Sequence, residues 1–276
     1  WSRGLGDVYK RQLFTMYSLN IVNAQNLDLF EKEIYVQGKD TLNYRILPPI
    51  NYDPEKTYPV HLFLHGAGER GNDNELQLVH GAKLFLKKEN REKYSSWVIF
   101  PQSPKNDWWG YEDPYKFDYK VTKSKAMGLV VKLMDGFTKR KDVDTNKIYV
   151  SGLSMGGMGT FVILNLRPNM FAAATPICGD GEPVSVTNYA KKVPIWIFHG
   201  SDDTVVSPKN SLKMAKAIIE NGDVVIFFNF RTDRGRQLTE VLSQNDFLEK
   251  GMSKLDLEFI TMTNYNESFK GIKKIY

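Results

Sequence analysis

The chain has 276 residues, of which 42% are hydrophobic and 25% charged, so its length and composition allow one α/β domain with a large core. The net charge of +5 comes from basic residues that are mixed with acidic ones, and no apolar run approaches the ~20 residues of a membrane span, so we expect neither a nucleic-acid partner nor a membrane partner. The single cysteine, Cys178, excludes an internal disulfide and a thiolate metal cluster.

Residues 1–25 are predicted to lie outside the fold. Residues 1–12 lack an initiator methionine and any apolar periodicity, and they resemble a translated adapter sequence. Residues 13–22 are mostly apolar, and Val22 and Ala24 stand at positions −3 and −1 of a cleavage site after Ala24. This pattern indicates the end of a truncated signal peptide and a secreted or periplasmic protein. A first amphipathic or edge-strand segment is the alternative.

Two antiparallel strands are predicted over 33–36 and 41–47, around a Gly-Lys-Asp turn. The continuous apolar run at 60–64 predicts a strand that is buried on both faces of a parallel sheet. This strand leads into the loop His65-Gly66-Ala67-Gly68-Glu69-Arg70-Gly71. We interpret His65 as a residue that holds the loop through hydrogen bonds, not as a catalytic base.

A helix is predicted over 75–88 and a strand over 97–100, followed by a polar loop that contains Trp108 and Trp109. Paired tryptophans in a polar loop are poorly explained by core packing. They are therefore candidates for an aromatic wall that binds an aryl or sugar substrate, and Gln102 in the same loop is a third substrate-binding candidate. The alternative is a loop that its tryptophans fix to the surface.

A Gly-x-Ser-x-Gly pattern stands at 152–156, between an apolar strand-like run and a glycine-rich helical segment from Met155 to Pro168. Ser154 on such a sharp turn has a strained backbone, so the residues two positions away must be nearly without side chains. The helix N-terminus behind the serine favours developing negative charge. The pattern indicates a nucleophilic serine. A glycine-rich turn that packs a helix closely against a sheet is the alternative.

The remaining segments alternate between helix and strand. This alternation predicts an α/β fold, a three-layer α/β/α sandwich with a mostly parallel sheet of about eight strands and an antiparallel N-terminal hairpin. We predict a single domain over 26–253 and an irregular tail over 254–276. The other predicted elements are a helix within 121–137, a strand and loop within 172–181, a strand at 193–198, a helix after Ser207 that stops at Gly222, and a strand at 223–230.

Three motifs resemble those of the α/β-hydrolase superfamily and occur in the same order. The chain is similar to its phospholipase/carboxylesterase and dienelactone-hydrolase-like branch, and to the exported "predicted peptidase" group related to feruloyl and acetyl-xylan esterases. The resemblance runs from about Glu33 to about Leu248. It implies a serine esterase that acts on a small-molecule ester or sugar ester, with no metal and no cofactor. The motifs are Leu64 to Gly71, Gly152 to Gly157, and His199-Gly200-Ser201-Asp202-Asp203-Thr204-Val205-Val206.

The resemblance implies roles for individual residues. Ser154 corresponds to the nucleophile. Asp203, the fifth residue of the last motif, corresponds to the acid that orients the base, and its neighbour Asp202 does not. Asp180 is a second position at which some hydrolases carry the acid.

The resemblance also implies an oxyanion hole made of two backbone N–H groups. Ala67, in the loop after the first buried strand, is the expected first donor, and Gly68 is the alternative. Met155, the residue after the serine, is the expected second donor.

The chain departs from the family pattern at the base. The base should follow the last strand, but all four histidines lie before Asp203. In relatives a glycine-histidine pair follows the last strand, and Gly235-Arg236 stands at that position here. Arginine stays protonated and cannot act as a base. Arg236 therefore marks the position expected to hold the base, and the hypotheses are a serine hydrolase of esters or peptides and a catalytically inactive binding module.

Overall fold

The computed structural model describes residues 26–110, 124–222, 225–227, 240–246, 248, 259–261 and 267–274. The chain forms two compact units, Trp1–Ile226 and Phe227–Tyr276. The second unit thus begins before residue 253, where the sequence places the end of a single domain.

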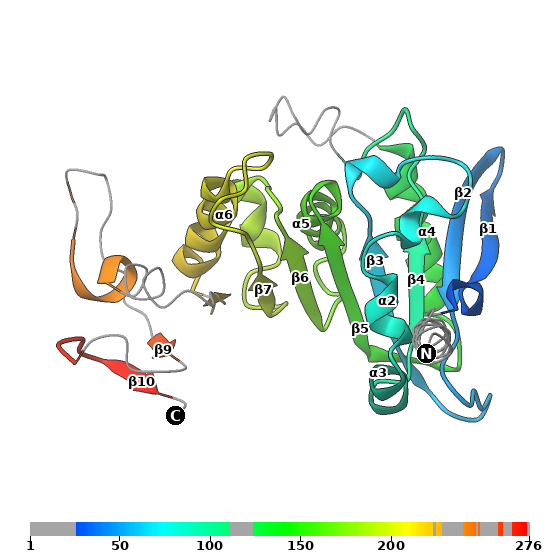
Figure 1. Ribbon diagram of the computed structural model, residues 1–276, viewed down its shortest axis with the longest axis horizontal. Helices are drawn as coiled ribbons and strands as arrows, with labels where there is room; N and C mark the ends of the chain where they lie inside the picture. Colours follow the sequence, from blue (N-terminus) through cyan, green and yellow to red (C-terminus); the bar gives the residue numbers. More distant parts are fainter. Residues whose placement is uncertain are drawn as a thin grey trace, which may run out of the picture. The chain divides into compact units, whose positions relative to one another are not determined.

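The first unit is built on an eight-stranded sheet of order β1-β2-β4-β3-β5-β6-β7-β8 (Figure 1). β1 and β2 form the predicted antiparallel hairpin, and β2 is also antiparallel to β4. From β4 through β3, β5 and β6 to β7, neighbouring strands are parallel. The predicted class, a mostly parallel sheet with an N-terminal hairpin, is confirmed. The strands are β1 (Glu31–Gln37), β2 (Asp40–Leu47), β3 (Tyr58–Leu64), β4 (Trp97–Pro101), β5 (Val143–Leu153), β6 (Ala173–Ile177), β7 (Ile195–Ile197) and β8 (Val225–Phe227).

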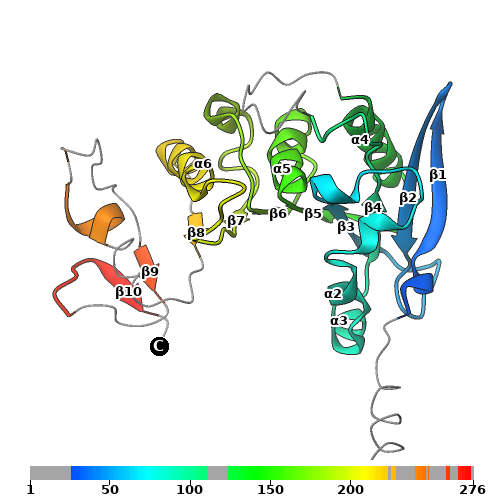
Figure 2. The same ribbon diagram turned by 45° about the horizontal axis from the view of Figure 1, so that its top comes forward.

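Helices cover both faces of this sheet and give the three predicted layers. α4, α5 and α6 lie on one face, and α2 and α3 lie on the other (Figure 2). The α-helices are α2 (Ala82–Leu86), α3 (Lys88–Lys93), α4 (Lys125–Phe137), α5 (Met155–Leu166) and α6 (Pro208–Glu220). The shorter helices are η1 (Leu27–Leu29), η2 (Ala67–Glu69), η3 (Leu76–Leu78) and η4 (Pro183–Asn188).

The helix predicted over 75–88 is instead divided into η3 and α2. Gly81 separates them with a φ of 86°, a conformation that residues with side chains rarely adopt. A Cβ atom at this position would also lie 2.6 Å from the Phe63 ring. The close approach to β3 therefore decides the break, and the helical periodicity could not show it.

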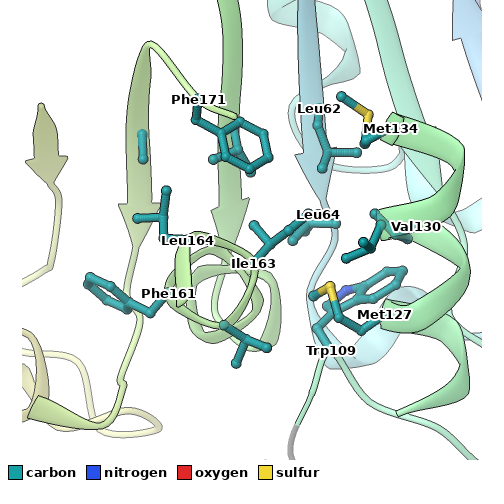
Figure 3. Close-up of a cluster of buried hydrophobic side chains, with 14 of the residues drawn as sticks. Leu62, Leu64, Trp109, Met127, Val130, Met134, Phe161, Ile163, Leu164 and Phe171 are labelled. Atoms are coloured by element: carbon teal, nitrogen blue, oxygen red, sulfur yellow. The ribbon is translucent and has the colours of Figure 1, made fainter. Parts of the chain in front are cut away.

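The main core lies between the sheet and α4 and α5. Every residue of α5 from Met155 to Leu164 is buried, so this helix has no solvent-facing side over most of its length. Figure 3 shows Ile163 of α5 beside Leu64 of β3. The helix that follows the serine is thereby fixed at the centre of the unit.

The second unit is described by a few short segments. η5 covers Glu240–Gln244, and the strands β9 (Phe259–Thr261) and β10 (Ile272–Lys274) form a parallel pair. The Gln244 amide joins η5 to the segment before β10, since it donates to Lys270 O at 2.9 Å and accepts from Lys270 N at 2.8 Å. In the described parts of both units, no helix is long and apolar enough to cross a membrane.

Candidate active site

Ser154 occupies a sharp turn between β5 and α5. Its φ of 55° and ψ of −115° lie in a region that non-glycine residues adopt only under strain. Its N–H donates to Ile177 O of β6 at 2.8 Å, which fixes the turn against the neighbouring strand. The strained serine backbone predicted from the Gly-x-Ser-x-Gly pattern is confirmed.

The two glycines of the pattern are required by close backbone approaches. A Cβ atom on Gly152 would collide with Gly156 O and lie 2.9 Å from Thr160 Oγ1. A Cβ atom on Gly156 would collide with Leu64 O and lie 2.8 Å from His65 O. Only glycine fits at either position, because backbone atoms cannot move aside as flexible side chains can.

The loop after β3 lies directly beside the serine. A Cβ atom built on Gly66 would be 3.8 Å from Ser154 Cβ. Ala67 follows it as the first residue of η2, and Met155 is the first residue of α5, where backbone N–H groups have no partner within the helix. Of the two residues predicted as oxyanion donors, Met155 directly follows Ser154 in the chain, and Ala67 directly follows Gly66, the residue that approaches Ser154.

His65 holds this loop in place. Its Nδ1–H donates to Gly66 O at 2.6 Å, and its Nε2 accepts from Ser103 N–H at 3.0 Å. Its carbonyl accepts from the Trp109 indole N–H at 3.0 Å. Burial lowers the pKa of His65 to about 4. Both ring nitrogens are thus occupied in a neutral, buried side chain, which confirms the interpretation of His65 as a structural residue.

We expect the free energy of unfolding to fall by about 3 kcal/mol per buried histidine as the pH drops from 6.5 to 4. Burial lowers the pKa of His61 and of His65 to about 4. In the unfolded chain these histidines are therefore protonated near pH 6.5, whereas in the folded chain they are protonated only near pH 4. Because the unfolded state binds more protons between these pH values, acid favours unfolding. Urea titrations at several pH values measure the slope. His65→Gln should flatten it, whereas His80→Gln, which removes a histidine with a half-exposed side chain, should not. An unchanged slope in His65→Gln would contradict the argument.

Asp203 follows β7, and Ser154 follows β5. Only β6 lies between these two strands, and all three are parallel, so both residues lie beyond the carboxyl ends of the strands. Its Oδ1 accepts from the N–H groups of Val205 and Val206, both at 2.9 Å. Burial acts to raise the pKa of Asp203, but these two N–H groups, the Cys178 thiol and His199 outweigh it and place the pKa below its ordinary value. Asp203 is therefore ionised at neutral pH, as an orienting carboxylate must be.

Asp180, the alternative acid, is engaged elsewhere. It is fully buried, its Oδ1 accepts from Gly181 N–H at 2.7 Å, and Lys213 Nζ of α6 lies 3.0 Å from the same oxygen. Asp202 is exposed. The geometry thus favours Asp203 over Asp180 and Asp202 as the acid that orients a base.

Cys178, His199 and Asp203 form a cluster whose possible ligand atoms lie within 4.8 Å of one another. Such a trio has the donor types of a zinc site. However, His199 Nε2 lies 2.8 Å from Val206 O, and a carbonyl oxygen only accepts, so this nitrogen carries a proton. His199 Nδ1 pairs with Ser211 Oγ at 2.7 Å. Because both ring nitrogens bind protein atoms, the cluster as it stands does not fit a metal ion.

The substrate-binding predictions for Trp109 and Gln102 are wrong. Trp109 is fully buried, and Figure 3 shows it in the core beside Met127 of α4. Gln102 is 2% exposed. Its side chain accepts from Asn74 N–H at 2.8 Å and donates to Glu69 O at 3.2 Å, so it supports the loop after β3. Both side chains find partners far away in sequence, which the polar composition of their own loop does not reveal.

Trp108 remains a candidate, and it has a partner that the sequence did not indicate. It is partly exposed, and the guanidinium carbon of Arg70 lies 3.6 Å from its ring centroid. Arg70 Nε also donates to Ala67 O at 3.0 Å. Arg70 thus joins the tryptophan to the predicted oxyanion residue. The position of Arg70 in the same loop as Gly66 is the sequence feature that could have indicated this contact.

The position predicted for the base, Arg236, lies outside the described residues. The chain's four histidines are all described, and the ring of each contacts residues other than Ser154. His61 Nε2 lies 2.6 Å from Ser151 Oγ, and His80 Nε2 lies 3.7 Å from Glu69 Oε1. The assignment of Arg236 stays a prediction.

Two family profiles match the chain. The profile "Prolyl oligopeptidase family" matches residues 109–180, which include Ser154 and the sharp turn around it, the elbow. The profile "BPG-independent PGAM N-terminus" matches residues 177–267, which include Asp203 and Arg236. The second match crosses from the first unit into the second.

Curated relatives of the chain include phosphoglycerate mutases, of which only a small part is matched. The 2,3-bisphosphoglycerate-independent phosphoglycerate mutase of Flavobacterium psychrophilum is 63% identical over 60 residues, which is 22% of this chain and 12% of that protein. The enzyme of the same name from Flavobacterium johnsoniae is 54% identical over 74 residues, which is 27% of this chain and 14% of that protein.

Solved structures match the larger part of the chain. A structure titled as a thermostable esterase is 33% identical with a TM-score of 0.67, and the match covers 76% of this chain and 57% of that one. The CE1 ferulic acid esterase of Anaeromyces mucronatus is 17% identical with a TM-score of 0.54, and the match covers 72% of this chain and 81% of that one. At that lower identity the likeness shows the fold alone.

Proposed function

Because the chain belongs to the α/β-hydrolase superfamily, we propose that its first unit is the scaffold of a serine hydrolase that cleaves carboxylic esters. Ser154 attacks the ester carbonyl, and the N–H groups of Ala67 and Met155 stabilise the oxyanion. Asp203 orients a base, and water releases the acid from the acyl-enzyme. The observation that carries the proposal is the strained backbone of Ser154, with a φ of 55°, held between glycines that have no room for a side chain.

The surroundings of Ser154 support an oxyanion hole and an ionised acid at one sheet edge. The loop before Ala67 is fixed by both nitrogens of His65, so its N–H groups are held in position before substrate arrives. Such preorganised donors are the main source of transition-state stabilisation in acyl transfer. Asp203 is held by two N–H groups on the far side of β6. A base between Ser154 and Asp203 would complete the set.

Aryl or sugar esters are the proposed substrates. The partly exposed ring of Trp108, stacked on Arg70, provides an aromatic surface beside the loop that holds Ala67. Among the similar structures, one is titled a ferulic acid esterase, and another is titled an acylaminoacyl peptidase, with a TM-score of 0.50. A peptidase of the same fold is therefore the second candidate.

We propose that the chain lacks its base because the sequence after β8 is not a hydrolase segment. The mutase profile extends to residue 267 and includes the stretch in which related hydrolases carry the histidine. The match begins at residue 177 and so also includes Asp203, but the hydrolase-like sheet continues to β8, which is why we place the change after β8 and prefer it to a single replacement at Arg236. We propose no mutase activity, since the mutases from the two Flavobacterium species are matched over only 12% and 14% of their length.

A graft tests this proposal. Residues 228–276 would be replaced by the segment that follows the last sheet strand of the thermostable esterase, and hydrolysis of p-nitrophenyl acetate would be compared with that of the unmodified chain. We expect the graft to raise kcat/KM by about 10²–10⁴-fold, the contribution of a positioned general base, and Arg236→His to have little effect.

The outcomes separate the alternatives. A graft that folds but stays inactive would count against Ser154 as a nucleophile. Activation by Arg236→His alone would show that the segment after β8 does serve as the hydrolase loop. High activity of the unmodified chain would show that a base is already present.

A further inference from the structure

A cavity lies away from Ser154, between the α2–α3 helices and the sheet. Its volume is about 570 Å³, which is within the range of small-molecule sites. α2 and α3 occupy the face opposite α5 (Figure 2). The cavity reaches the sheet at Pro59 and His61 of β3 and at Lys147 and Tyr149 of β5.

The cavity and the serine are separate sites. On β5, Tyr149 lines the cavity, and Ser154 follows the last residue of the same strand. Five residues of extended strand span roughly 16 Å. The cavity thus contacts the middle of β3 and β5, whereas Ser154 lies beyond the carboxyl end of β5.

The walls suit a flat aromatic ring. Phe85, Tyr94 and Tyr149 line the cavity together with aliphatic side chains such as Val98. His61 also lines it, and its ring centroid lies 4.8 Å from that of Phe85. Burial lowers the pKa of His61 to about 4, so this imidazole is neutral at pH 7 and adds no charge to the wall.

The charged groups of the lining are all basic. Arg91, Lys93 and Lys147 line the cavity, and no aspartate or glutamate does so among the described residues. Lys147 is paired with Asp144 at 3.0 Å, and Lys93 Nζ lies 5.1 Å from the Tyr94 ring centroid. A negatively charged ligand therefore meets cations and no carboxylate in this lining.

Arg91 is the group best placed to bind an anion. Its Nη2 donates to the Pro48 carbonyl at 3.0 Å, which fixes the guanidinium at the wall. In the described part of the chain no carboxylate pairs with it. Burial lowers the pKa of Arg91, because the guanidinium is partly removed from water. A carboxylate beside it would supply the missing counter-charge.

We propose that this cavity binds an aryl carboxylate, with the ring between Phe85 and Tyr149 and the carboxylate on Arg91. The site does not depend on Ser154 or on a functional base. It would hold an aromatic acid whether or not the chain hydrolyses esters.

Isothermal titration calorimetry of the full chain tests the proposal with trans-cinnamate and its neutral counterpart, cinnamamide. We expect cinnamate to bind about tenfold more tightly than cinnamamide, the effect of one charge-assisted hydrogen bond. Arg91→Gln should remove this preference. Lys88→Gln is the matched control, because it removes a cation from the same helix. The Lys88 side chain is 84% exposed and does not line the cavity. It should leave both affinities unchanged.

A second variant locates the binding. Leu84 stands at the rim and is 55% exposed, so Leu84→Trp can fill the cavity without disturbing the core, and it should weaken the binding of both compounds by about tenfold or more. The proposal is overturned by equal affinity for cinnamate and cinnamamide, by the absence of cinnamate binding at millimolar concentration, or by binding that Arg91→Gln and Leu84→Trp both leave unchanged.

Discussion

Gly156→Ala should lower the free energy of unfolding by at least about 3 kcal/mol, the upper part of the range for overpacking a rigid site. The added methyl group would collide with Leu64 O and lie 2.8 Å from His65 O. Both are backbone atoms of the segment that joins β3 to the loop after it, and β3 is held by parallel pairing on both sides. Neither can retreat without breaking the sheet. Thermal or urea unfolding of the purified chain measures the loss.

Gly128→Ala is the control for this prediction. Gly128 lies in α4, is exposed, and has no atom within 4 Å of an added Cβ. The same chemical change should therefore stabilise the protein by about 0.5–1 kcal/mol, the helix preference of alanine over glycine. Similar effects at both positions would show that the close approach at Gly156 does not govern stability.

Ser154→Ala and Ser154→Gly should both abolish ester hydrolysis in the grafted protein, where a base is present, with kcat lowered by about 10⁴–10⁶-fold. The reason is that both remove the attacking oxygen. Release of p-nitrophenol measures the loss, and labelling by a fluorophosphonate should disappear in parallel. Hydrolysis that survives in either variant would remove Ser154 from the mechanism.

The same two variants distinguish the chemical role of the Ser154 hydroxyl from the strain in the Ser154 backbone. Alanine keeps a side chain at a φ of 55°, so Ser154→Ala should leave the stability almost unchanged. Glycine adopts this conformation freely, so Ser154→Gly should raise the free energy of unfolding by about 1 kcal/mol or more. A glycine variant less stable than the alanine variant would show that the turn stores no strain.

The elbow could be predicted from the sequence because its requirements are local. Gly152 and Gly156 stand two residues from Ser154, and a turn that excludes side chains at those positions is visible in five consecutive letters. The layered fold could also be predicted, since the alternation of strands and helices along the chain restricts the connections between them.

The surroundings of the serine could not be predicted in the same way. The Trp109 N–H finds its acceptor at His65 O, which lies 44 residues earlier in the chain, and nothing in the polar loop indicates that the ring is buried. Gln102 likewise supports the loop that contains Glu69. Pairings between distant segments decide both positions, whereas composition describes only the neighbours in sequence.

The place of β3 in the sheet affects how the protein forms during synthesis. Val60 is hydrogen-bonded beside Ile148, so β3 leaves the ribosome long before β5 does. Until then, this apolar strand has one of its two edges open, and contacts between such distant segments form slowly. α5 cannot bury its sides before that pairing exists. The turn at Ser154 should therefore be among the last parts of the nascent hydrolase unit to become ordered.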